Sequence, residues 1–493
     1  MIPPIQRFLD TASRWPERIA IQDDAGCRLS YGELAARSKA LAAGLRARLG
    51  NDAETIVSVA AKNHADHVVA MFGVFLAGYA WLPLNPRSAT ALNDEIFRSL
   101  GPALLLLDTA CEDCVSTAGL PVARFGAGAP AGLQALSAPA ESFVLPELEP
   151  DRAMSVKLTG GTTGRPKAVI QTQRVIATVI ADLTEVFAIS ERDVNLAAAP
   201  LSHGAFHFLL PVLIAGGRHV IVSDLSPEAL LGAMEQHDVT LSFMPPTLII
   251  KLCDSGQARP ERFPALRQLI YSTAPMPPAQ IRRAWSAFGP KIAALYGQVE
   301  APMTLAAMTA EEMATTGKLE STGRACPSTV LRIADSGTED GTGDILARGP
   351  LVVPRYLTGE ALDMIDGWLR TGDLGRIDTD GHLYIRGRSR EMLITGGFNV
   401  YPAEVESALL AVQGVYEACV FGVEDSYWGE RVEAAVVASD AVSDEALRDA
   451  VRAAIGAVAA PKAIHRLKTL PRNAVGKIVR REIATLIRPF SET

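Results

Sequence analysis

The fold of this chain is decided by residues 159–168, which read Thr159-Gly160-Gly161-Thr162-Thr163-Gly164-Arg165-Pro166-Lys167-Ala168. They follow a short strand of alternating apolar residues that ends at Leu158. The glycines, threonines and lysine offer many N–H and O–H donors that can surround an anion. Pro166 precedes the lysine and no Ser or Thr follows it, so this is not a Walker A loop. The ordered string favours a phosphate-binding loop over a flexible polar turn.

Helices and strands alternate on both sides of this loop. Ser30 and Glu33 form a capping box and Gly50 gives a stop signal, so the sequence predicts a helix between them. Further on, apolar runs over 219–222 and 239–244 flank a helical segment. A βαβ unit of this kind predicts a parallel sheet covered by helices.

Beyond residue 340 the pattern changes to short strands separated by tight turns. Gly341-Thr342-Gly343 and Asp380-Gly381 predict two hairpins. Later, strands alternate with helices again, starting with a helix over 402–410. We therefore predict an α/β chain with a large N-terminal domain over 1–389 and a small α+β domain over 390–493.

Composition excludes several classes of protein. Hydrophobic residues make up 48% of the 493 residues and charged residues 21%, which is ordinary globular usage rather than that of a disordered or fibrous chain. The net charge of −8 argues against general binding of nucleic acid or of anionic membranes. The apolar run from Val68 to Leu84 is shorter than the ~20 residues of a membrane span. The start of the chain lacks an export signal, so we expect a cytoplasmic protein whose cysteines are reduced.

Further motifs accompany the phosphate loop in a fixed order. Together with the loop they resemble the motifs of the adenylate-forming superfamily, in particular its AMP-dependent acyl- and aryl-CoA synthetases. The resemblance spans nearly the whole chain and implies a large domain of layered parallel-type sheets and helices plus a distorted small barrel, with a small, mobile C-terminal domain. The motifs are Leu29-Ser30-Tyr31-Gly32-Glu33-Leu34, Tyr296-Gly297-Gln298-Val299-Glu300, Trp368-Leu369-Arg370-Thr371-Gly372-Asp373 and Pro471-Arg472-Asn473-Ala474-Val475-Gly476-Lys477-Ile478.

The resemblance implies an enzyme that activates a carboxylic acid with ATP and Mg²⁺. A carboxylate is a poor acyl donor because its charge repels nucleophiles and its oxygen is a poor leaving group. Attack on the α-phosphate of ATP expels pyrophosphate and gives an acyl-AMP, from which a thiol then displaces AMP. Such chemistry depends mainly on positioning and charge neutralisation. CoA is the expected thiol, and the phosphopantetheine of a separate carrier protein is the alternative.

The resemblance also assigns the nucleotide contacts to particular residues. Tyr296 is expected to stack on adenine, Asp373 to accept hydrogen bonds from the ribose hydroxyls, and Glu300 to hold the metal ion. Val299 replaces a threonine of the family pattern, so one hydroxyl near the α-phosphate is missing. Thr163 is expected to take part in catalysis. The other expected nucleotide contacts are Thr159, Gly160, Gly161, Thr162, Gly164, Lys167, Ser272, Thr273, Ala274, Pro275, Gly297, Gln298 and Arg388.

A catalytic lysine and a hinge are expected in or near the small domain. By the resemblance, Lys477 reaches between the substrate carboxylate and the α-phosphate and offsets the repulsion between two anions. Arg390 occupies the hinge position. Rotation about it is expected to withdraw Lys477 and to bring Gly396-Gly397 to a tunnel for the pantetheine arm. Trp428 resembles a tryptophan that helps to seat CoA, with Lys462 as the one basic residue remaining nearby.

By the family pattern, the acid is expected to lie beside residues 200–207, 244–247 and 272–275 and the residues after Glu300. None of these segments contains Lys or Arg, so a second carboxylate on the substrate would be buried without a partner. The sequence therefore favours a monocarboxylic acid with an aryl or a short to medium aliphatic tail over a malonate-like diacid. Neither His203 nor His207 is expected to act as a general base, because a carboxylate needs no deprotonation at pH 7. The expected lining residues are His203, Phe206, His207 and Met244.

Two other functions fit this sequence less well. A non-catalytic nucleotide-binding regulator would be expected to lack Lys477, Glu300 or Asp373, and all three are present. Oxidation of an adenylate, as in beetle luciferase, is supported by no specific motif.

Overall fold

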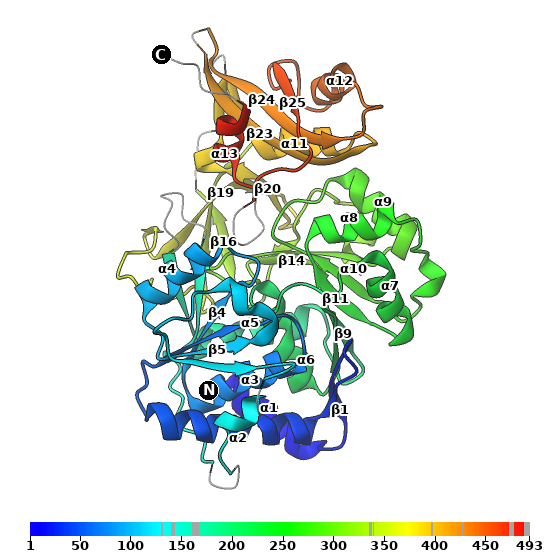
Figure 1. Ribbon diagram of the computed structural model, residues 1–493. Coiled ribbons are helices and arrows are strands. Elements are labelled where there is room, and N and C mark those ends of the chain that lie inside the picture. Colours follow the sequence, from blue (N-terminus) through cyan, green and yellow to red (C-terminus); the bar gives the residue numbers. More distant parts are fainter. Residues whose placement is uncertain are drawn as a thin grey trace.

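The computed structural model describes residues 1–129, 132–139, 143–159, 167–334, 338, 340–395, 398–425, 427–472 and 478–487. Figure 1 shows a large body of layered sheets and helices, with a smaller body above it that holds the C-terminal elements. The large body contains two mainly parallel sheets and one antiparallel sheet. The predicted fold class is thereby confirmed.

A six-stranded sheet carries the predicted phosphate loop. Its strand order is β6-β5-β3-β4-β7-β8, and all neighbours run parallel except β7 and β8. These last two strands are antiparallel and pair Thr159 with Lys167, so they flank residues 160–166, which lie outside the described residues. The strands are β3 (Ile56–Ala60), β4 (Ala80–Leu84), β5 (Leu104–Asp108), β6 (Val122–Phe125), β7 (Ala153–Thr159) and β8 (Lys167–Thr172).

A nine-stranded sheet forms the second layer, in the order β15-β14-β13-β12-β11-β9-β10-β1-β2. The helix α7 (Pro227–Gln236) connects β10 to β11, and both strands run parallel to β9, as the predicted βαβ unit requires. However, β9 lies between them, so the two strands are not neighbours. The strands are β1 (Ile19–Asp23), β2 (Arg28–Ser30), β9 (Val194–Ala197), β10 (Arg218–Ile221), β11 (Leu241–Met244), β12 (Gln268–Tyr271), β13 (Ile292–Tyr296), β14 (Ala306–Met308) and β15 (Arg324–Ala325).

One hydrophobic cluster joins these two sheets through the helices between them. It contains residues of α1, α2, α3, α5 and α6 together with strand residues such as Leu106 of β5 and Ile270 of β12. The N-terminus of α2 is the predicted capping box, in which Ser30 Oγ accepts from Glu33 N at 3.1 Å and Glu33 Oε2 accepts from Ser30 N at 2.7 Å. The helices of this body are α1 (Pro4–Arg14), α2 (Tyr31–Leu49), α3 (Ala65–Ala77), α4 (Thr90–Leu100), α5 (Gln173–Val186), α6 (Leu209–Ala215), α8 (Pro246–Asp254), α9 (Pro278–Phe288) and α10 (Ala310–Thr316).

Short 3₁₀ helices complete the large body. They are η1 (Thr109–Cys114), η2 (Gly132–Leu136), η4 (Gly204–Phe208) and η5 (Pro260–Arg262). Within the described ranges, none of the helices combines the length and the apolar character that a membrane span requires.

The antiparallel sheet is a half-barrel that lies next to the small body (Figure 1). Its β16 and β17 pair Ile333 with Ile345, and its β19 and β20 pair Ile377 with Leu383, so both predicted hairpins are confirmed. Buried Ile345 and Leu383 pack against Ala306 of β14, which fixes the half-barrel to the nine-stranded sheet. The strands are β16 (Val330–Ile333), β17 (Gly343–Arg348), β18 (Met364–Ile365), β19 (Trp368–Ile377) and β20 (Leu383–Arg388).

The small body has a hydrophobic core of its own. Its main cluster is made entirely of residues between Leu393 and Ile464, and a second cluster joins Ile483 of α13 to Phe421 of β23. The predicted helix over 402–410 is α11. The elements are η6 (Ser389–Glu391), β21 (Leu393–Thr395), β22 (Phe398–Val400), α11 (Pro402–Leu410), β23 (Val415–Asp425), β24 (Gly429–Ala438), α12 (Asp444–Ala454), β25 (Ala463–Arg466) and α13 (Arg480–Ile487).

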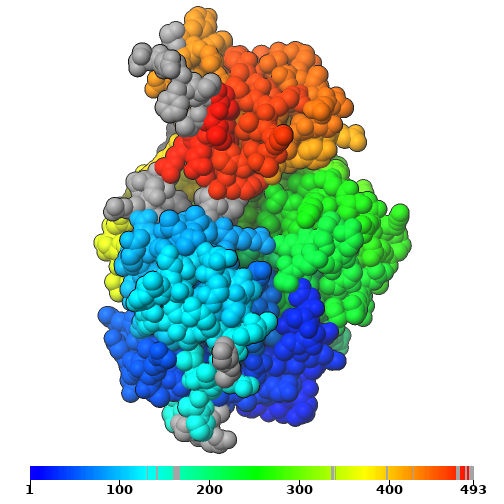
Figure 2. All heavy atoms as spheres, viewed as in Figure 1, coloured from blue at the N-terminus to red at the C-terminus, as the bar shows by residue number. Residues whose placement is uncertain are grey.

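Polar contacts connect the small body to the large one, on which it sits in Figure 2. Arg386 Nη1 of β20 lies 2.6 Å from Glu404 Oε1 of α11, and Gln280 Nε2 of α9 donates to the carbonyl of Leu410 at 3.1 Å. The predicted domain boundary after Ser389 falls in η6, between β20 and β21. The boundary and the hinge at Arg390 stay predictions.

Arg480 of α13 provides a test of how the small body is held together. Its guanidinium donates to Glu406 Oε1 at 2.7 Å and to the carbonyl of Val420 at 3.0 Å, and it also pairs with Glu391. Burial raises the pKa of Glu406, so removal of the cation leaves a poorly solvated carboxylate. We expect Arg480→Met to destabilise the small body by about 2–3 kcal/mol, because both partners are only partly screened by water.

Hydrogen exchange of the β23 and β24 amides, followed by mass spectrometry, measures this effect. Arg452→Met is the matched control, because Arg452 also pairs with two carboxylates, Glu445 and Asp449, but on an exposed helix face. Exchange in β23 and β24 should accelerate in Arg480→Met and stay unchanged in Arg452→Met. Equal protection in both variants would contradict a stabilising role of Arg480.

Candidate active site

One edge of the nine-stranded sheet collects most of the predicted site. The strands β13, β12, β11 and β9 are parallel neighbours, so their carboxyl ends meet at the same edge. The segments that end or follow these strands are Tyr296–Glu300, Ser272–Pro275, Met244 and residues 200–207. The expected adenine, magnesium and acyl segments are thereby brought together by strand topology.

Asp373 of β19 lies at the centre of a polar network at this edge. Its Oδ2 accepts from Tyr296 Oη at 2.5 Å and from Gln298 Nε2 at 2.6 Å, and its Oδ1 lies 2.8 Å from Arg388 Nε. Gln298 Nε2 also donates to the carbonyl of Thr371 at 2.8 Å. The side chain of Asp373 is therefore held by three residues that were predicted to contact the nucleotide.

The pKa of Tyr296 is raised well above its ordinary value, first by burial of its phenol and then by the negative charge of the adjacent Asp373 carboxylate. The phenol therefore stays protonated and acts as the donor, while Asp373 acts as the acceptor. This hydrogen bond fixes the Tyr296 ring at the end of β13. A ring held in this way presents a flat face at a defined position.

Glu300 lies at the end of the same segment and is half-buried. Tyr356 Oη donates to its Oε1 at 2.9 Å, and among the described residues none donates to its Oε2. Within those residues, one carboxylate oxygen is left without a donor. Oxygen atoms of this type are the ligands that Mg²⁺ prefers, so Glu300 fits the predicted metal role.

Tyr356 also contacts Lys167, which the sequence assigned to the nucleotide. Lys167 Nζ lies 4.9 Å from the centre of the Tyr356 ring and 3.3 Å from Glu360 Oε2. Tyr356 lies shortly after the buried residues Leu351 and Val353, and its backbone forms an isolated antiparallel β-bridge with Val169. Sequence reasoning missed this tyrosine, because it belongs to no motif and its bridge to β8 joins segments far apart in the chain.

Val299 replaces the family threonine with apolar packing. It is half-buried and packs in a cluster with Val169, Val175, Val353 and Tyr356. Its backbone carbonyl accepts from Gln171 Nε2 at 3.3 Å. The position of the segment is thus fixed without the hydroxyl.

The loop after β12 is mostly exposed. Ser272 is buried, whereas Thr273, Ala274 and Pro275 are exposed. Thr273 has a φ of +77°, a left-handed conformation that costs a β-branched residue free energy and that is typical of functional loops.

Three of the four expected acyl residues are buried at the same edge, and His203 is half-buried. Met244 and Phe206 are buried, and the Nδ1 atom of each histidine has a local partner, Ser202 Oγ at 2.8 Å from His203 Nδ1 and the Gly204 carbonyl at 3.2 Å from His207 Nδ1. Burial lowers the pKa of His203 to about 4 and that of His207 well below its ordinary value. Both imidazoles are therefore neutral at pH 7.

Several predicted residues cannot be placed or lie away from this edge. Trp428 belongs to the small body, where Lys462 Nζ lies 4.7 Å from the centre of its ring. Arg390 is exposed in η6. The predicted residues outside the described part of the chain are Gly160, Gly161, Thr162, Thr163, Gly164, Gly396, Gly397 and Lys477, and the same holds for the side chain of Thr159.

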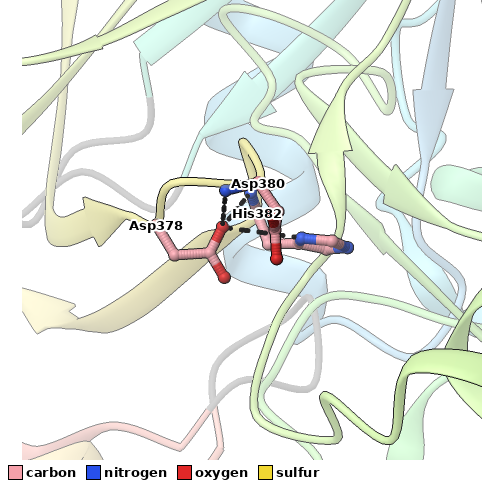
Figure 3. Close-up of side chains that lie close together, drawn as sticks. All are labelled: Asp378, Asp380 and His382. Carbon is pink, nitrogen blue, oxygen red and sulfur yellow. Dashed lines mark hydrogen bonds and ion pairs between the residues drawn. The ribbon is translucent and has the colours of Figure 1, made fainter.

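A cluster of Asp378, Asp380 and His382 has the residue types of a metal site (Figure 3). Lys318 Nζ, however, lies 2.8 Å from Asp378 Oδ2, 2.6 Å from Asp380 Oδ2 and 3.2 Å from His382 Nδ1. Hydrogen bonds from this ammonium lower the pKa of Asp378 despite its desolvation. The lysine supplies the positive charge, so the cluster is a structural ion-pair network.

Comparison with known proteins gives consistent matches over nearly the full length. The family model described as AMP-binding enzyme matches residues 8–357, and that of the AMP-binding enzyme C-terminal domain matches residues 404–477. A feruloyl-CoA synthase of an Amycolatopsis species is 31% identical, over 93% of this chain and 94% of the relative. A medium/long-chain-fatty-acid–CoA ligase of Mycobacterium tuberculosis is 29% identical, over 91% of this chain and 84% of the relative.

A solved structure of o-succinylbenzoate CoA synthetase from Bacillus subtilis, in complex with its acyl-adenylate intermediate, has a similar fold. Its TM-score is 0.84 at 28% identity, and the match covers 98% of each chain.

Gly297 provides a test of the geometry after β13. A Cβ at this position would lie 2.3 Å from Met303 N and 2.6 Å from Met303 Cα, so the backbone of residues 297–303 can close on itself only around a glycine. We expect Gly297→Ala to destabilise the large body by about 2–3 kcal/mol through this overlap, and to displace Tyr296 and Gln298. Urea denaturation measures the loss.

Gly232→Ala is the matched control. Gly232 lies inside α7, and nothing stands within 4 Å of a Cβ built there. This substitution should stabilise by about 0.5–1 kcal/mol through helix propensity. A stability loss of the same size in both variants would contradict the steric argument.

Proposed function

Because the chain belongs to the AMP-binding enzyme family, we propose that it is an ATP-dependent carboxylic acid–CoA ligase. In the first half-reaction an acid and ATP give acyl-AMP and pyrophosphate, and in the second CoA displaces AMP to give the acyl-CoA. The observation that supports this best is the network in which Tyr296, Gln298 and Arg388 hold the Asp373 carboxylate at the edge where the parallel strands end.

This network is proposed to bind the nucleotide. A carboxylate has about four acceptor sites, and three protein donors occupy two on Oδ2 and one on Oδ1. Asp373 therefore accepts from one ribose hydroxyl at the remaining site on Oδ1, and from the other in exchange for one of its protein donors. The ring of Tyr296, fixed by its bond to Asp373, provides a stacking face for adenine. Arg388, paired with Asp373, contributes positive charge near the ribose or the phosphates.

The phosphates are held by the loop between β7 and β8, by Lys167 and by Glu300 through Mg²⁺. When bound, the metal ion neutralises phosphate charge. Lys477 of the C-terminal segment is proposed to enter between the carboxylate and the α-phosphate, where it offsets their mutual repulsion. Rotation of the small body about Arg390 then exposes the adenylate to the thiol.

The acid lies in the proposal beside Phe206, His207 and Met244, which are buried and mostly apolar. An aryl or a short to medium aliphatic tail fits such a lining, and relatives include ligases of ferulate and of fatty acids. CoA is the proposed thiol, because the relatives are CoA ligases and Lys462 lies over the Trp428 ring, which combines a cation with an aromatic face. Loading of a carrier protein is left to the test below.

A panel of acids tests the reaction as a whole. With ATP and Mg²⁺ but without CoA, aryl and medium-chain acids should give enzyme-bound acyl-AMP and pyrophosphate exchange. Added CoA should convert the adenylate to a thioester, detected by mass spectrometry. If the adenylate persists in the presence of CoA but acylates a phosphopantetheinyl carrier protein, the chain would instead be an enzyme that loads carrier proteins. Failure of every acid to support exchange would contradict the proposed function.

Lys477→Ala separates the two half-reactions. We expect pyrophosphate exchange to fall at least about a hundredfold, because an interaction made mainly in the transition state is lost. Thioester formation from preformed acyl-AMP should be largely retained, since Lys477 is withdrawn during that step. Lys468→Ala, which removes an exposed lysine of the same body, should leave both steps unchanged. Equal loss of both steps in Lys477→Ala would count against the proposed division of labour.

A further inference from the structure

A buried lysine lies where the sequence predicted a pocket without cations. Lys157 is in the middle of β7, between the apolar residues Val156 and Leu158, and only 7% of it is exposed. Its Nζ donates to the carbonyl of Ser202 at 3.0 Å. The segments expected to line the acyl pocket contain no Lys or Arg, as predicted, but the fold places this lysine against one of them.

Two aromatic rings surround the Lys157 ammonium. Its Nζ lies 4.0 Å from the centre of the Trp81 ring and 4.0 Å from that of Phe206, which is itself an expected acyl-pocket residue. In the described part of the chain, no carboxylate lies within 4.0 Å of this nitrogen, and Ser202 supplies its one hydrogen-bond acceptor. Ring faces compensate only part of the cost of burying a cation.

Further polar atoms near this lysine are buried and have no hydrogen-bond partner among the residues that the structure describes. They are Trp81 Nε1, His67 Nε2 and His207 Nε2. The His67 and Trp81 rings are 6.5 Å apart, and His207 adjoins Phe206 with ring centres 3.9 Å apart. Positive charge on Lys157 helps to lower the pKa of both histidines, which places all three groups in one electrostatic environment.

Buried donors without acceptors are rare in folded proteins, because each costs the desolvation of the group. The Lys157 ammonium, which has one hydrogen bond, and the unpaired Trp81 indole N–H both lack an acceptor. The ligand that these two groups require is an oxygen acceptor, and a negative charge on it would also compensate the lysine. His67 and His207 each donate Nδ1–H to a carbonyl, so their Nε2 atoms are acceptors, which a hydroxyl group on the ligand could satisfy as a donor. Lys157 stands two residues before Thr159 and contacts Ser202 and Phe206, so such an oxygen would belong to the acid.

We propose that Lys157 is the specificity-determining residue of the acyl pocket and that its ammonium binds an oxygen acceptor, a carboxylate above all, on the tail of the acid substrate. This inference rests on the proposed function. The substrate class becomes an acid whose tail is mostly apolar but bears a second oxygen group. Burial lowers the pKa of the Lys157 amine, and a bound carboxylate would favour its protonated form.

A structural role is the competing explanation, in which Lys157 only holds the Ser202 carbonyl and fills the space between Trp81 and Phe206. The two roles differ in what a substitution does to related acids. A structural lysine affects all acids alike, whereas a recognition lysine affects only those that bear the second oxygen group.

Matched pairs of acids therefore provide the test. Heptanoate is compared with heptanedioate, and hydrocinnamate with its para-hydroxy and para-carboxy derivatives, by kcat/KM in pyrophosphate exchange and by Kd of the acid in calorimetry. In the wild type the oxygen-bearing member of at least one pair should be preferred by about tenfold or more, as expected for a hydrogen bond to a charged group. In Lys157→Met that preference should be lost, while the plain acid keeps its activity.

Lys251→Met is the matched control, because Lys251 Nζ also donates to a backbone carbonyl, that of Leu225 at 3.0 Å, but from an exposed position. It should retain the wild-type preference. ATP binding reports whether each variant is folded. If Lys157→Met is not folded, the test rests on the wild-type preference and on Lys157→Arg, which should retain that preference because arginine keeps the donor.

The outcomes separate this inference from the proposed function. Activity with plain acids and no preference within any pair in the wild type would overturn the role of Lys157 and leave the ligase intact. An equal fall for both members of each pair in Lys157→Met would identify a structural lysine and also overturn it. Absence of exchange with every acid, by contrast, would remove the proposed function itself.

Discussion

The carboxylate of Asp373 is the contact on which the arrangement of the site depends. It belongs to β19 of the half-barrel, yet it is bound by Tyr296 and Gln298, at and just beyond the end of β13 in the nine-stranded sheet, and by Arg388 at the end of β20. Only 5% of Asp373 is exposed, so its charge must be balanced by these donors. The same bonds that satisfy the charge also join two sheets and position the residues proposed to hold a nucleotide.

Much of the fold follows from signals that act over a few residues. The helix after Ser30 begins and ends as predicted because both its caps are local, and the hairpins at Gly341 and Asp380 depend only on the turns themselves. Strand order depends on contacts between distant segments, which is why the βαβ unit was predicted correctly but the insertion of β9 between its strands was not.

The site was predictable to the extent that motifs mark it. Tyr296, Gln298 and Asp373 lie in motifs, Arg388 was assigned by the family resemblance, and the structure brings all four into one network. Tyr356 and Lys157 lie in no motif, and their roles depend on which segments the fold places beside them. A lysine in the middle of an apolar strand was the one signal in the sequence that could have indicated an internal cation.

The polar contacts between the two bodies affect how much free energy it costs to move the small body. Arg386 with Glu404 and Gln280 with the Leu410 carbonyl are contacts that water can replace at little net cost, unlike the apolar cores on either side. These contacts therefore contribute little to the difference in free energy between alternative placements of the small body. A ligand at the edge of the sheet that contacts the small body therefore needs only a modest part of its binding energy to select one placement, as the proposed rotation about Arg390 requires.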